Sequence, residues 1–192
     1  MDSPVAPSAE TRSSGPLTAV LAGVVLVVGI VFISQATYAN AWYSAFKTVH
    51  VIAAIVWIGG GTLLTILGVA AERKRDPIEL ANIARQAATV GEKVFAPAGL
   101  VVVAMGIAMM LNTDWGWGKF WIVAGLVGYA ITFFTGVGVL SPLAKKVAAL
   151  TEEKGPTHPE TAAAITRILM IARIDVAMLL LVVVDMVTKP FS

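Results

Sequence analysis

Long apolar runs separated by short polar segments dominate this sequence. Five of these runs contain roughly 20 residues or more, and at ~1.5 Å per residue each can cross a hydrocarbon layer of ~30 Å. The predicted membrane helices are residues 16–35, 43–70, 93–111, 119–139 and 160–188. The pattern therefore predicts an all-α integral membrane helical bundle.

The polar segments between these runs differ in character. Residues 1–15 are rich in Ser, Pro and Ala, which is typical of a disordered tail. Residues 78–89 have mixed polarity with helical spacing, which suits either a helix lying at the membrane interface or an extension of the 93–111 helix. Pro142 follows the 119–139 helix and is expected to lie beyond its end.

The first apolar run allows two interpretations. Ala39-Asn40-Ala41 resembles the small-residue site at which a signal peptide is cleaved. However, Asp2 and Glu10 precede the run, and the run is long for a signal peptide, so a retained helix is favoured. The predicted domains are a polar tail at 1–15, an extra transmembrane helix at 16–35 and a four-helix membrane domain at 43–190.

Composition supports a membrane location. The 192 residues are 57% hydrophobic and 14% charged, against about 25% charged in soluble domains. Membrane lipid is therefore an expected partner, and other membrane proteins or further copies of the chain are additional candidates. The formal net charge of +2 indicates no nucleic-acid surface, and the absence of cysteine excludes disulfides, iron–sulfur clusters and thiolate metal sites.

The distribution of basic residues predicts the orientation. They are concentrated in two long loops: Arg73, Lys74, Arg75, Arg85 and Lys93 in one, and Lys145, Lys146, Lys154 and Arg167 in the other. The opposite side has Lys47, Lys119 and Lys189. The positive-inside rule therefore predicts a multi-pass protein of the cytoplasmic (inner) membrane, with its N-terminus inside and its C-terminus outside.

Ionisable residues inside a membrane helix are costly and therefore indicate function. His50 shares one helical stripe with Lys47, Ala54, Trp57 and Gly61, and this stripe is expected to face the bundle interior. The imidazole could bind a metal or haem iron, or relay protons. A hydrogen bond to a neighbouring helix is an equally good interpretation.

The last helix carries three further charged residues. Asp175 lies on a stripe with Met178, Val182 and Met186, and Asp185 lies at the edge of that stripe. Asp185 is expected at the depth of His50, where a carboxylate could orient the imidazole. Arg173 lies on the opposite face, where it could pair with another helix or extend to the interface.

Methionines near this depth suggest a further metal site. Met109, with Met105, Met110 and Met186, could combine with His50 to bind Cu(I), because thioether and imidazole are suitable ligands. Methionine is also common as apolar filler, so copper is the less favoured interpretation.

Several short motifs resemble a bacterial family of predicted integral membrane proteins, the domain of unknown function 2269. The matching motifs are Lys47-Thr48-Val49-His50 with Ala53, Trp57 and Gly60, then Asp76-Pro77, Trp117-Gly118-Lys119-Phe120-Trp121 and Met186-Val187-Thr188-Lys189-Pro190. The resemblance covers residues 43–190 and implies a four-helix core. It implies no specific activity.

The layout is more distantly similar to two characterised groups. One is the haem-binding bacterial protoporphyrinogen oxidase family, whose functional His and Lys correspond to His50 and Lys119. Gly128 and Tyr129 stand where that family has a further histidine. The other is the copper-resistance D-type domain, which uses several intramembrane histidines.

Three functions follow, in order of preference. The first is a non-enzymatic membrane protein that acts as a small subunit or assembly partner. The second is a redox protein or porphyrinogen oxidase with haem b on His50 and Lys119 near substrate carboxylates. The third is a copper or proton conduit that uses His50, Asp185 and the methionines. The sequence does not decide whether the protein is an enzyme.

Overall fold

A computed structural model describes residues 41–191, and all regular structure in that range is helical. The predicted tail at 1–15 and the predicted helix at 16–35 lie outside the described residues. The contacts divide the chain after Ala45, within α2 (Ala41–Ala54), and the bundle described below is that of residues 46–191.

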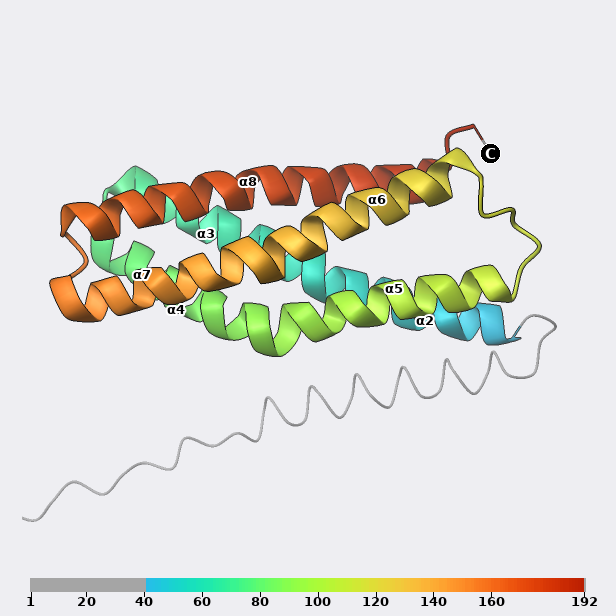
Figure 1. Cartoon of the computed structure of the whole chain (residues 1–192), viewed down its shortest axis with the longest axis horizontal. Helices are drawn as coiled ribbons and strands as arrows, with labels where there is room; N and C mark the ends of the chain where they lie inside the picture. The colour runs from blue at the N-terminus through green and yellow to red at the C-terminus, as the bar shows by residue number, and fades with distance from the viewer. Residues whose placement is uncertain (1–40, 192) are drawn as a thin grey trace, which may run out of the picture. The chain divides into compact units, whose positions relative to one another are not determined.

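The described chain forms four long helical rods, and each of the first three contains one π-helical turn. The chain runs back and forth along the bundle, as Figure 1 shows. Rod 1 is α2 (Ala41–Ala54), η1 (Ile55–Gly59) and α3 (Gly60–Lys74); rod 2 is α4 (Pro77–Val90), η2 (Gly91–Phe95) and α5 (Ala96–Leu111). Rod 3 is α6 (Phe120–Thr135), η3 (Gly136–Leu140) and α7 (Ser141–Lys154); rod 4 is α8 (Pro159–Thr188).

Rods 2 and 3 are longer than the apolar runs predicted. Each has 35 residues, Pro77–Leu111 and Phe120–Lys154. Residues 78–89 therefore extend the following helix rather than forming a separate interfacial one. The expectation that Pro142 lies beyond the helix end was wrong, because the rod continues through it.

The π turns explain how these rods tolerate proline. Proline lacks an N–H, and its ring clashes with the carbonyl four residues earlier in an α-helix. Both η2 and η3 end just before an alanine or serine that precedes a proline, at 91–97 and 136–142. The N–H of Ala96 donates to the Gly91 carbonyl, and that of Ser141 to the Gly136 carbonyl. This wider hydrogen-bonded turn lets the helix continue.

A short turn joins rods 1 and 2. Arg75 adopts the left-handed conformation with φ 55° and ends α3. Asp76 Oδ1 accepts hydrogen bonds from the N–H groups of Ile78 and Glu79, at 3.0 and 2.9 Å. Pro77 occupies the first position of α4, where its missing N–H has no cost. The segment therefore reverses the chain and supplies acceptors for the first N–H groups of α4.

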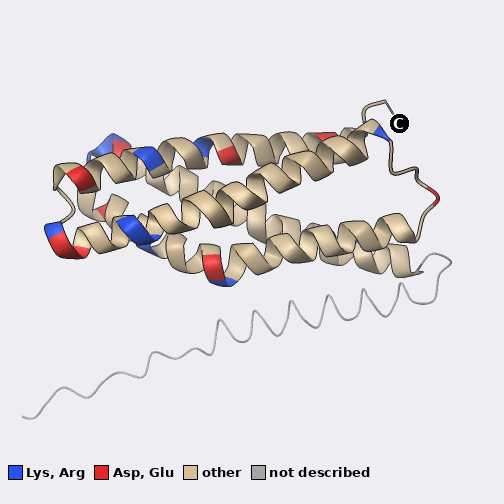
Figure 2. Ribbon diagram, viewed as in Figure 1, with Lys and Arg blue, Asp and Glu red and all other residues tan. Residues whose placement is uncertain are grey.

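Charged residues gather where rods 1 and 3 end and rods 2 and 4 begin, as Figure 2 shows. We call this the polar end. Its core consists of small and branched apolar side chains: Ala81, Ala84, Ala88, Ala144, Val147, Leu150, Ala164, Ile165, Ile168 and Leu169. The alanines on α4 recur at helical spacing, so α7 and α8 can approach closely.

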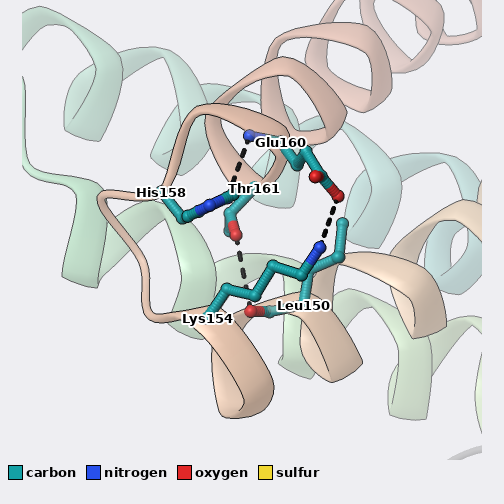
Figure 3. Close-up of polar contacts among 5 residues, drawn as sticks. All are labelled: Leu150, Lys154, His158, Glu160 and Thr161. Carbon is teal, nitrogen blue, oxygen red and sulfur yellow. Dashed lines mark hydrogen bonds and ion pairs between the residues drawn. The ribbon is translucent and has the colours of Figure 1, made fainter.

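The turn between α7 and α8 is held by polar contacts (Figure 3). Lys154 Nζ lies 2.8 Å from Glu160 Oε2, and His158 Nδ1 accepts from the Glu160 N–H at 3.3 Å. The buried Thr161 hydroxyl donates to the Leu150 carbonyl at 3.4 Å. His158 is thus the N-cap of α8.

The opposite end of the bundle is apolar and aromatic. Gly125 and Gly128 of α6 lie against Met186 and Val182 of α8, so these two helices pack closely. Beyond them, Met110, Trp121 and Ile122 form a small core. We call this the aromatic end.

Rods 1, 2 and 3 are long and apolar enough to cross a membrane. Rod 4 is not among these candidate spans, so a four-helix membrane core is not established by length and composition alone.

Candidate functional site

A cavity of about 430 Å³ lies midway along the bundle, with walls from all four rods. Parts of all three π turns line it: Trp57 from η1, Gly91, Glu92 and Phe95 from η2, and Gly136, Val137 and Leu140 from η3. Because π turns in α-helices occur frequently at functional sites, their meeting at one cavity makes it the leading candidate site. Its volume is in the range of small-molecule sites.

Aromatic rings form one wall of the cavity. The Trp57 ring contacts the Phe133 ring edge to face, with centroids 6.1 Å apart, and Phe95 lines the cavity beside them. Tyr129 supports this wall by stacking on Phe133 at 5.5 Å and by donating a hydrogen bond to the Gly99 carbonyl at 3.1 Å. The ring positions are therefore held by contacts on more than one helix.

Two glycines make room for these rings. A Cβ added at Gly60 would lie 2.5 Å from Phe95 Cε1, and one added at Gly99 would lie 2.9 Å from Phe133 Cδ2. Each distance is shorter than a normal carbon–carbon contact of about 3.5–4.0 Å. Larger residues at either position would push a ring from its place.

Three ionisable side chains line the cavity. Lys145 Nζ and Glu92 Oε2 form an ion pair at 2.7 Å, so these two charges offset each other. Asp175 of α8 also lines the cavity, and within residues 41–191 it has no hydrogen-bond or ion-pair partner. With both acids ionised, the cavity carries one uncompensated negative charge.

Arg173 does not compensate Asp175. The Arg173 guanidinium pairs with the Glu72 carboxylate of α3. Arg173 is absent from the cavity lining. This inter-helix contact joins rods 1 and 4 near the polar end.

His50 lies outside the cavity, in contact with rod 2. Its Nδ1 lies 2.7 Å from the Val102 carbonyl oxygen, and its ring packs against Gly106. Since a carbonyl can only accept, Nδ1 carries the proton and donates, which leaves the Nε2 lone pair available. His50 therefore makes a hydrogen bond to a neighbouring helix, which was one of its two predicted roles. The same hydrogen bond fixes the ring so that Nε2 could bind a metal.

Asp185 makes no hydrogen bond to His50. Its Oδ2 is buried without a hydrogen-bond partner among the described residues, and it lies 3.4 Å from the position of a Cβ added at Gly125. The Trp121 Nε1 donor is likewise buried with no partner within 41–191. Asp185 therefore faces α6, whereas His50 faces α5.

The other predicted site residues are dispersed. Lys47 and Lys119 are exposed, and Lys119 is the N-cap residue of α6. Met109 is half-buried on α5, and neither it nor the two lysines lines the cavity. Among residues 41–191, no group of three or more His, Cys, Asp or Glu side chains could hold a metal ion.

A haem in the cavity would find no imidazole ligand, because neither His50 nor His158 lines it. The polar side chains that line it are Glu92, Lys145, Asp175, Thr65 and Ser141. The cavity therefore offers haem iron no imidazole, and of the two described histidines His50 is the one that lies within the bundle.

Three residues of the stripes drawn from the sequence, Trp57, Gly61 and Asp175, line the cavity. Helical spacing did not indicate Phe95, Phe133 or the Glu92–Lys145 pair, which come from rods 2 and 3. The available signal was a pattern shared by residues 91–97 and 136–142, in which a glycine is followed three residues later by valine, a large apolar residue, a small residue and proline.

A family described as "Predicted integral membrane protein (DUF2269)" matches residues 44–190. The chain belongs to this family. No curated protein and no solved structure matches the chain. The family description supports a membrane location and assigns no activity.

Proposed function

We propose that this protein is a non-enzymatic, multi-pass protein of the cytoplasmic membrane that binds a small, largely apolar molecule in the cavity. The supporting observation is the cavity of about 430 Å³ at the level of three π turns. Most of its lining is apolar, as in small-molecule sites. As a ligand-binding protein, it would act as a small subunit or assembly partner.

We further propose that rod 4 crosses the membrane with the other three. Exposed large apolar side chains occur within 51–67, 94–111, 120–139 and 170–187, one range on each rod. Each range covers about 25–30 Å of helix, close to the ~30 Å of a hydrocarbon core. The exposed large apolar side chains that lie outside these four ranges are those of Trp42, Ile78, Trp117 and Phe191.

The polar end is proposed to face the cytoplasm, because it carries the basic residues of both long connections. The C-terminus then lies outside. A phosphatase–fluorescent protein reporter fused after Ser192 should report a periplasmic position. A cytoplasmic signal would overturn the arrangement of four crossing rods with an additional N-terminal helix at 16–35.

Ligand binding is tested by filling the cavity. Ala172 of α8 lines it, whereas Ala177 of the same helix is exposed and does not. Purified protein should bind the neutral fluorophore N-phenyl-1-naphthylamine with saturation. Ala172→Phe should abolish saturable binding, and Ala177→Phe should leave it unchanged. Equal binding by both variants would refute the proposed cavity function.

The available Nε2 of His50 supports a second candidate function, in which His50 binds haem b or Cu(I). In this proposal Lys119 would bind carboxylates of a porphyrin, and Met109 would supply a thioether to copper. A Soret band or bound copper that is lost in His50→Ala would support it. A colourless, copper-free preparation obtained with haem and copper supplied would eliminate it.

A further inference from the structure

We propose that the cavity selects a lipophilic cation, with Asp175 pairing with its positive charge and aromatic rings contacting its apolar groups. This inference rests on the proposed ligand-binding function and adds the chemical class of the ligand. It follows from three features of the cavity: its net charge, its aromatic wall and its apolar surroundings.

The charge of the cavity favours a cation. Glu92 and Lys145 are 2.7 Å apart and neutralise each other, which leaves the carboxylate of Asp175. The nearest basic residue in sequence, Arg173, is occupied by Glu72 on another rod. No described basic side chain forms an ion pair with Asp175. A positively charged ligand would supply the missing partner.

The position of Asp175 strengthens this need. It lies within the exposed apolar range 170–187 of rod 4, which is proposed to cross the hydrocarbon layer. Ionisable groups at such a depth are costly unless they are paired or solvated. A carboxylate that has no partner among residues 41–191 and lies beside a cavity is therefore best explained by a partner that enters the cavity.

The aromatic wall supplies the second element of recognition. Trp57, Phe95 and Phe133 line the same cavity as Asp175. The negative faces of aromatic rings attract cations, and aromatic enclosures are used to recognise quaternary ammonium groups. A compact metal ion would not use these rings and would require several oxygen ligands. An organic cation with apolar substituents satisfies both the carboxylate and the rings.

The test compares two probes of similar size that differ in charge. Methyltriphenylphosphonium carries one permanent positive charge, and triphenylphosphine oxide is neutral. Binding of each to the purified full-length protein is measured by equilibrium dialysis in detergent at one pH. The wild type should bind the cation at least tenfold more tightly, and a factor of ten corresponds to about 1.4 kcal/mol.

Variants of α8 then assign the preference to one carboxylate. Asp175→Asn should remove the cation preference while keeping the affinity for the neutral probe within about twofold, because it preserves size and removes charge. Asp175→Glu should retain the preference. Asp185→Asn is the matched control, since Asp185 is on the same helix but outside the cavity lining, and it should behave as the wild type.

The outcomes separate this inference from the proposed function. Equal affinity of the wild type for both probes, or an unchanged cation preference in Asp175→Asn, would overturn the inference. The cavity function would still stand if Ala172→Phe blocked the neutral probe. If Asp175→Asn failed to fold, loss of cation binding in Ala172→Phe with an unchanged preference in Asp175→Glu would support the inference. Loss of the preference in Asp175→Glu with intact neutral binding would count against it.

Discussion

Two glycines of α6 face side chains of different stiffness on α8, and this difference leads to an unexpected order of stability. A Cβ added at Gly128 would lie 2.5 Å from Val182 Cγ2, and one added at Gly125 would lie 1.9 Å from Met186 Cε. Valine is β-branched and strongly prefers one χ1 rotamer in a helix. Methionine is unbranched and can move its terminal methyl. The shorter contact is therefore expected to cost less.

The magnitude follows from a reference substitution. Gly61 is helical, and a Cβ there would meet nothing within 4 Å, so Gly61→Ala should stabilise its helix by up to about 1 kcal/mol. Gly128→Ala makes the same backbone gain but must displace Val182 or separate α6 from α8. Overpacking of this kind costs about 1–3 kcal/mol, so Gly128→Ala should be less stable than Gly61→Ala by that amount. The free energy of unfolding of Gly125→Ala should lie within about 1 kcal/mol of that of Gly61→Ala.

The assay is reversible unfolding in mixed micelles by added sodium dodecyl sulfate, followed by far-ultraviolet circular dichroism. Free energies of unfolding are compared at one detergent composition, with the wild type measured alongside the three variants. Equal stability of Gly128→Ala and Gly61→Ala would refute the argument from valine stiffness. If Gly125→Ala were the least stable variant, contact distance rather than side-chain flexibility would govern the α6–α8 contact.

Three further predictions concern the helix ends. Asp76→Ala should lower the free energy of unfolding by about 1 kcal/mol, because the N-cap of α4 loses both hydrogen bonds; Asp76→Asn is the control that keeps them. The Lys189 ammonium lies 4.1 Å from the ring centroid of Trp115 and 5.0 Å from that of Trp121. Lys189→Met should therefore alter tryptophan fluorescence and lower the free energy of unfolding by about 0.5–1 kcal/mol. An unchanged fluorescence spectrum would contradict this prediction. The hydrogen bond from Lys154 lowers the pKa of the Glu160 carboxyl. The Lys154–Glu160 pair therefore stabilises the fold at neutral pH, and this stabilisation is lost as pH falls through the lowered pKa. An NMR titration should place this pKa below its ordinary value, and Lys154→Gln should raise it.

The apolar runs predicted the membrane class and the helical fold, because run length and composition alone decide whether a segment can cross lipid. The apolar runs did not predict where the helices end. Pro142 indicates a helix end when only local geometry is considered, yet rod 3 continues because η3 widens the turn before it. A π turn depends on how the helix packs, and helical periodicity does not reveal it.

The candidate site shows the same limit. A stripe drawn at 3.6 residues per turn put His50, Trp57 and Gly61 on one face, and the last two do line the cavity. His50 instead donates to Val102, and the η1 turn lies between His50 and Gly61. Since a π turn contains more residues than an α turn, a stripe counted at α-helical spacing loses its register across it.

The sequence by itself determined that this is a helical membrane protein with basic connections on one side and costly charges inside its apolar runs. Those properties depend on composition along a single helix. Only the tertiary structure decided which charges are paired, because Glu72 with Arg173 and Glu92 with Lys145 join different rods. The same packing left Asp175 beside a cavity and without a partner in the part of the chain that the structure describes. The arrangement of helices around a bundle is a property of all the rods together.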